Sequence, residues 1–250
     1  MSTLPRVGGL AVAIALIATA VPVQARPLAG TEISIEATTD LRRRGISWSD
    51  GKAALAANAY VPVAEGLEAG LGVASLRGSP RHDGADAVID LDLGYRHISG
   101  PWSFGMRVAG HVFPGESGLG YAEAGAWAGL LIGPAQIDLS ASYAPSQDAI
   151  GGDNLYLAAR ATVAVPGTPL TLVAGAGRSS GSVDDPVRAA RLRPDGRYHD
   201  YHLGVDHVRG PLTLGVRYSD TTINADGDRG GDADARHAGS RLIARAAFTF

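Results

Sequence analysis

Charged residues recur at every second position within segments that are otherwise apolar. In 86–97, for example, Asp90 and Asp92 alternate with Leu91 and Leu93. Because successive residues of a strand point to opposite faces, this spacing gathers the charges on one face. Carboxylates and guanidinium groups around a shared space can orient a polar or zwitterionic solute, and rings of charge set selectivity in channels. The predicted pore-lining set is Glu36, Asp90, Asp92, Arg96, Arg107, Asp138, Arg160, Asp206, Arg217 and Arg245.

Three consecutive arginines, Arg42, Arg43 and Arg44, stand at the outer end of the first predicted strand. They are predicted to lie at an outer mouth. One interpretation is a mouth that attracts anions. The other, which we favour, is a set of rim arginines bound to lipopolysaccharide phosphates or to nearby acids.

Metal chemistry is not favoured by the spacing of the candidate ligands. His199 and His202 are three residues apart and so face opposite sides of a strand, whereas His199 and His207 share a face but lie roughly 27 Å apart at ~3.4 Å per residue. The acidic run Asp226–Asp234 lacks the spaced ligands and the distal Glu of the twelve-residue calcium loop. We therefore expect a solvated loop there, and no metal or cofactor.

Enzymatic chemistry finds little support either. Nucleophilic catalysis needs a Ser, a His and an acid that converge, but His111 lies on the fifth predicted strand and Ser142 on the seventh. No phosphate loop occurs. The prediction is that the protein is not an enzyme, with a barrel lipid hydrolase as a less favoured alternative.

The first 25 residues have the pattern of a cleaved secretory signal. Arg6 supplies the positive region, Leu10–Ala20 is a short apolar run, and Val23-Gln24-Ala25 is a small-residue cleavage site. Its removal leaves a domain over 26–250 with a formal charge of about −4 and no cysteine. That charge offers no basic surface for nucleic acid, and the missing thiols exclude a disulfide scaffold.

Twelve segments of roughly 8–12 residues with period-two alternation follow the signal, a length that suits tilted membrane strands. Tight turns containing Gly and Pro alternate with longer polar loops, the asymmetry of a bacterial outer-membrane barrel. Arg facing lipid near the midplane would cost about 2–4 kcal/mol, so the charged faces are expected to point inward. The segment 120–132 cannot be oriented in this way, because Glu123 shares its face with Tyr121 and Trp127. The predicted strands are 31–41, 52–62, 66–76, 86–97, 101–112, 120–132, 134–144, 154–165, 169–178, 198–208, 211–220 and 239–250.

The last strand places Leu242, Phe248 and Phe250 on one face and Arg245 on the other. An apolar strand at the chain end would leave a bare edge in a soluble sandwich, but in a closed barrel it pairs with the first strand. An amphipathic last strand ending in Phe250 also resembles the signal read by the barrel assembly machinery.

At Thr39–Lys52 the chain reads TDLRRRGISWSDGK, which resembles the first strand and loop of the TorF-type porin family. The positions that match are Asp40, Arg42, Arg44, Gly45, Ile46, Ser47, Ser49 and Lys52. Leu41 and Trp48 stand where the family usually has an aromatic residue and Gln. The resemblance implies an outer-membrane barrel that acts as a channel, without a defined substrate.

These observations together predict an all-β, closed antiparallel transmembrane barrel of about twelve strands, an up-and-down meander in the outer membrane of a Gram-negative bacterium. The expected function is passive diffusion of small polar solutes or ions. Outer-membrane lipid, lipopolysaccharide, the assembly machinery and small solutes are the expected partners. The alternative is a non-conducting structural or adhesive barrel that acts through long outer loops; 178–198 and 220–239 could also fold inward and constrict a pore.

Overall fold

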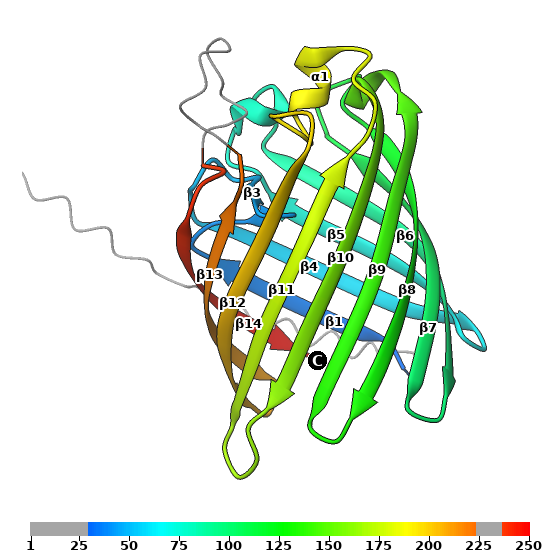
Figure 1. Cartoon of the computed structure of the whole chain (residues 1–250), viewed down its shortest axis with the longest axis vertical. Helices are drawn as coiled ribbons and strands as arrows, with labels where there is room; N and C mark the ends of the chain where they lie inside the picture. Colours follow the sequence, from blue (N-terminus) through cyan, green and yellow to red (C-terminus); the bar gives the residue numbers. More distant parts are fainter. Residues whose placement is uncertain (1–29, 224–236) are drawn as a thin grey trace, which may run out of the picture.

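The computed structural model describes residues 30–223 and 237–250, so the predicted signal (1–25) and the acidic run 226–234 lie outside it. Twelve antiparallel strands form a closed barrel in which each pairs with its neighbours along the chain, and the last pairs with the first (Figure 1). The predicted fold is therefore confirmed. The barrel strands are β1 (Glu32–Thr38), β4 (Ala54–Ala64), β5 (Leu67–Ser75), β6 (Ala87–Ser99), β7 (Trp102–Val112), β8 (Tyr121–Ile132), β9 (Ala135–Gln147), β10 (Gly152–Ala164), β11 (Leu170–Ser180), β12 (Tyr198–Arg209), β13 (Leu212–Thr221) and β14 (Arg241–Thr249).

The tight turns all lie at one end of the barrel, at the bottom of Figure 1. Three of them are Gly-Pro pairs in which Gly100, Gly133 and Gly210 have φ of 58°, 57° and 56°. A two-residue hairpin turn of type II′ requires positive φ at its first central residue, and glycine adopts it without steric cost. Sequence therefore fixes the short, regular end of the barrel.

The strand faces divide as the alternation predicts. Leu91 and Met106 point outward and are 52% and 63% exposed, whereas Val88 and Ala109, one position out of phase, are buried. Trp102 and Tyr143 are also exposed on the outer surface. An apolar exterior around a charged interior is the reverse of a small soluble barrel, and it suits a lipid environment.

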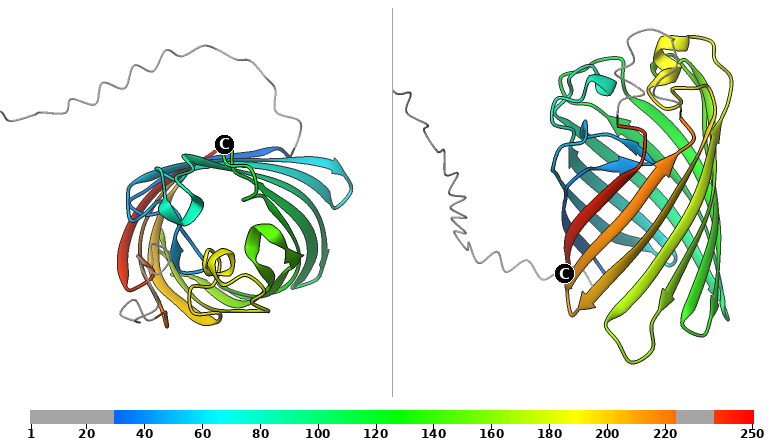
Figure 2. Two further views of the ribbon diagram at one scale, coloured as in Figure 1. Left: turned by 90° about the horizontal axis from the view of Figure 1, so that it is seen from above. Right: turned by 60° about the vertical axis from the view of Figure 1, so that its left-hand side comes forward.

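An apolar core fills the end of the barrel that carries the long loops. Trp48, Leu76, Phe113, Ile150 and Leu192 come from five successive outer loops and belong to one buried cluster. Three short helices, η1 (Pro80–His82), η2 (Asp148–Ile150) and α1 (Pro186–Ala190), lie within the ring of strands in the left view of Figure 2. We call this assembly of loops the outer cap. No helix in the described ranges is long and apolar enough to cross a membrane.

Buried arginines join the loops of the outer cap through backbone carbonyl groups. Arg81 donates from Nε to the Ser47 carbonyl (3.2 Å) and from Nη1 to the Arg191 carbonyl (2.9 Å). Arg191 in turn donates to the carbonyls of Ala149 (2.6 Å) and Leu119 (3.3 Å). Two side chains thus link all five loops, which explains how segments with little regular structure hold one arrangement.

His82 lies at the centre of the outer cap, between Trp48 and Phe113, at ring centroid distances of 4.5 and 5.0 Å. Neither of its ring nitrogens has a hydrogen-bond partner among the described residues. Burial, reinforced by the charges of Arg191 and Arg81, lowers the pKa of His82 to about 2. The imidazole is therefore neutral in the folded cap.

Candidate functional site in the barrel interior

The first outer loop does not stay at the rim but forms a small hairpin inside the barrel. Its strands are β2 (Arg42–Arg43) and β3 (Ile46–Ser47), joined by Arg44 and Gly45 with φ of 53° and 77°. A Cβ on Gly45 would lie 2.6 Å from Asp200 Cβ and from Thr221 Cγ2, so only glycine fits where the turn meets β12 and β13. Asp40, 1% exposed, holds the base of the hairpin by accepting from Arg42 Nε at 2.8 Å and Ser47 Oγ at 2.5 Å.

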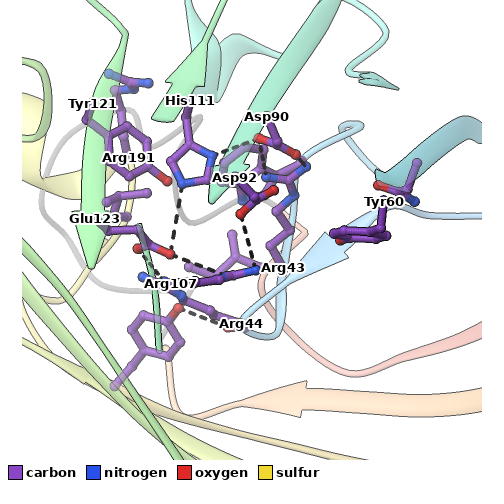
Figure 3. Close-up of a pocket in the computed structure, with 15 residues that line it drawn as sticks. Arg43, Arg44, Tyr60, Asp90, Asp92, Arg107, His111, Tyr121, Glu123 and Arg191 are labelled. Atoms are coloured by element: carbon purple, nitrogen blue, oxygen red, sulfur yellow. Dashed lines mark hydrogen bonds and ion pairs between the residues drawn. The ribbon is translucent and has the colours of Figure 1, made fainter. Parts of the chain in front are cut away.

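The hairpin carries two guanidinium groups into the interior, where each meets a carboxylate on the opposite wall (Figure 3). Arg43 forms a two-pronged pair with Asp90 of β6, at 3.1 Å from Nη1 and 2.5 Å from Nη2. Arg44 donates to Glu123 of β8 at 2.6 Å, and its carbonyl accepts from Tyr198 Oη at 2.9 Å. These charge-assisted bonds tether the hairpin across the barrel.

Two basic side chains from the barrel strands complete this cluster. His111 of β7 lies between the carboxylates, with Nδ1 2.7 Å from Asp90 Oδ1 and Nε2 3.9 Å from Glu123 Oε1. Arg107, half-exposed, reaches Asp92 at 3.5 Å and Glu123 at 3.9 Å. The walls of β6, β7 and β8 therefore present three carboxylates, and the loop supplies two of the cations that neutralise them.

A series of cavities follows these charges along the barrel interior. One of about 270 Å³ lies directly beneath the outer cap, lined by Arg43, Asp90 and Glu123 among others. It shares Asp92 and Arg107 with a second cavity of about 320 Å³. That cavity in turn shares Arg96 with one of about 660 Å³ at the inner rim. Charged residues shared between neighbouring cavities therefore follow one another from the cap toward the turn end of the barrel.

Two further charge groups occupy the other walls. Asp206 of β12 lies 3.2 Å from Arg245 Nη2 and 3.5 Å from Arg217 Nη2, and Arg245 also bonds Glu36 at 2.6 Å. A cavity of about 370 Å³ is lined by Asp138 and Arg160, which pair across β9 and β10, and by His202 and Trp127.

All ten residues of the predicted pore-lining set thus face the interior, in three separate groups, and their part in conduction stays a prediction. The three arginines expected at the outer mouth do not lie on a rim that faces lipid. Arg42 is bonded to Asp40, and Arg43 and Arg44 point down into the interior. The reason is the turn at Arg44-Gly45, which reverses the chain inside the barrel rather than above it.

Glu123 is the residue of this site that sequence reasoning left unassigned. Tyr121, Glu123 and Trp127 all face the interior, while the other face of β8 is formed mainly by alanines. Alternation alone does not orient β8, because its bulky aromatic side chains point inward, against the rule that the apolar face meets lipid. No group of three or more His, Asp or Glu side chains within 30–223 and 237–250 is arranged to hold a metal ion.

Solved structures with a similar fold include two porins and an outer membrane channel, each of which matches over most of both chains. NanC porin matches with a TM-score of 0.57 at 12% identity, over 87% of this chain and 98% of that chain. KdgM porin matches with 0.57 at 7% identity, over 88% and 99%. An outer membrane channel from Pseudomonas putida F1 matches with 0.51 at 12% identity, over 88% and 95%. Such low identities show a shared porin-like barrel fold and nothing finer.

No curated protein sequence matches the chain. The sequence profile of a family described as "bacterial protein of unknown function (Gcw_chp)" does match it, over residues 24–239. That match spans most of the 250 residues. The chain belongs to the Gcw_chp family.

Proposed function

We propose that this protein is an outer-membrane channel for small polar solutes whose outer end is covered by its own loops. The observation that carries the proposal is the series of cavities from the outer cap toward the inner rim, in which neighbouring cavities share the charged residues Asp92, Arg107 and Arg96. A barrel that served only as a scaffold would gain more stability from a closely packed interior than from hydrated, ionised walls.

Three features support a location in the outer membrane: the apolar exterior, the signal pattern and the last strand. An apolar exterior is costly in water and favourable in lipid. The signal pattern of residues 1–25 would direct the chain to the periplasm, and the strand ending in Phe250 would be recognised by the assembly machinery. Lipopolysaccharide would surround the loop end. The resemblance of residues 39–52 to TorF-type porins agrees with the same assignment.

The outer cap determines how such a channel would work. Because five loops share one apolar core and two buried arginines, the path to the outside is covered in this state. Passage of a solute therefore requires the cap to loosen, and we expect infrequent openings rather than a permanently open pore. The same packing favours the alternative function, a non-conducting barrel that presents its loops to a surface partner.

Ion selectivity in planar bilayers separates the two functions. Asp90→Asn removes negative charge from the path and should shift the reversal potential under a KCl gradient toward anion preference, whereas Arg107→Gln should shift it toward cation preference. Asp83→Asn, in an exposed loop, is the matched control and should leave the potential unchanged. A folded native barrel that never produces current steps would support the non-conducting barrel instead.

A further inference from the structure

We propose that the carboxylates Asp90, Asp92 and Glu123 form a binding site for a solute that carries a guanidinium group. In this proposal Arg43 and Arg44 of the first loop occupy the site in the covered state, as tethered substitutes for the solute. The inference rests on the proposed channel for its role in transport, but the binding itself does not require conduction.

The geometry around the two loop arginines is that of guanidinium recognition. Arg43 meets Asp90 through both of its terminal nitrogens, and its guanidinium lies over the Trp48 ring at 4.3 Å from the centroid. Arg44 bonds Glu123 and lies over the Tyr156 ring at 4.7 Å. A planar fork that meets a carboxylate edge-on, with an aromatic face beneath it, selects guanidinium over a compact ammonium.

The two occupants belong to a loop, whereas the carboxylates that they bond belong to the rigid wall. Asp90, Asp92 and Glu123 are fixed on β6 and β8 by continuous ladder pairing through β7. Arg107 approaches its carboxylates only to 3.5 and 3.9 Å, so it does not replace the loop cations. If the hairpin withdraws, the wall keeps a net negative charge and can accept a cation from solution.

His111 provides an independent indication of a missing ligand. It is 7% exposed and lines the cavity of about 270 Å³, and its Nε2 makes no hydrogen bond within the described part of the chain. Because Nδ1 is engaged by Asp90 Oδ1, Nε2 is the ring atom that a polar group of a solute in this cavity can reach.

Tethering predicts a competition that can be measured. A group held on a short loop acts at an effective concentration in the millimolar range. A free solute therefore binds with an apparent affinity that is reduced in proportion to the fraction of time that the site is free. Removing the two tethered groups should therefore tighten binding of a free guanidinium compound, although it removes two cations from the protein.

Calorimetric titration of the folded full-length barrel with L-arginine tests this directly. The variant Arg43→Ala/Arg44→Ala should bind L-arginine at least about tenfold more tightly than the native protein. L-citrulline, its uncharged isostere, should bind no more tightly. The matched control is Arg197→Ala/Arg209→Ala, which removes two exposed arginines and should behave as the native protein. Adding Asp90→Asn and Glu123→Gln to the first variant should abolish the gain.

The inference is overturned if the Arg43/Arg44 variant binds L-arginine no more tightly than the control variant, or if L-citrulline binds equally well. Should the double variant not fold, Arg43→Gln alone keeps the Arg44 tether and must change the affinity in the same direction. Because heat rather than current is measured, a barrel that binds L-arginine but conducts nothing refutes the channel and keeps the site. A barrel that conducts but fails this titration refutes only the site.

Discussion

Leu76→Ala should loosen the outer cap without disturbing the barrel. Leu76 is 0% exposed and belongs to the apolar cluster that contains Trp48, Phe113 and Ile150. Truncating such a leucine removes buried methyl groups and leaves a cavity, at a cost of about 2–5 kcal/mol. The strands are held by their hydrogen-bond ladders, so this cost should appear mainly in the equilibrium between the covered and the loosened cap.

The size of the effect follows from that cost. At about 3 kcal/mol, with ~1.4 kcal/mol per factor of ten, the loosened population should rise about 100-fold. Hydrogen–deuterium exchange of peptides from 76–86 and 186–197 measures this population, since loop amides exchange when the cap opens. We expect about 100-fold faster exchange in these loops and unchanged exchange in β9 and β10.

Leu91→Ala is the matched control for this experiment, because it removes the same atoms from a side chain that is 52% exposed on the outer surface. It should leave loop exchange unchanged. The reasoning is refuted if folded Leu76→Ala protein exchanges its loops at the native rate, or if both substitutions accelerate the loops equally.

Two further predictions concern buried charge. Burial, with the charges of Arg191 and Arg81, lowers the pKa of His82 to about 2 from an ordinary value of 6.5. The stability that neutral His82 gives to the folded cap is therefore complete above the unfolded pKa of 6.5, and it is lost as the pH falls from 6.5 toward 2. Acidification from roughly pH 7 to pH 5 should cost the cap about 2 kcal/mol and accelerate loop exchange; His82→Phe should remove that dependence, and an unchanged pH response would contradict this role. Asp206→Asn leaves Arg217 and Arg245 without their shared carboxylate and should lower the free energy of unfolding by about 1–3 kcal/mol in urea titrations. Asp138→Asn, whose carboxylate accepts from Gln136, is its control, and an equal loss in both variants would argue against the network.

The barrel could be predicted because its rules are local. Alternation fixes which side of each strand is apolar, and the Gly-Pro pairs such as Gly133-Pro134 fix the turns. Pairing of the last strand with the first followed from the need to leave no open edge. These signals act within a few residues, so they can be recognised without knowing which distant residues come into contact.

The interior site was only partly predictable, because its assembly depends on distant contacts. Asp90, Asp92 and Arg107 were assigned from alternation alone. The inward course of the first loop depends on Arg44 and Gly45 both adopting positive φ, and on space beside Asp200 and Thr221. An X-Gly pair between short extended segments is a hairpin signal, but three arginines beside it favoured an exposed rim. The outer cap likewise depends on packing between five loops.

Single-channel recording of the native barrel beside a variant that lacks residues 41–48 tests the channel most directly. Heat-modified migration on gels should first establish that both barrels are folded. The native protein should give rare, brief current steps, and the shortened protein frequent steps of larger conductance, because the deletion removes the hairpin from the interior and Trp48 from the cap. A folded shortened barrel that gives no current steps would contradict the claim that the interior is a path for solutes.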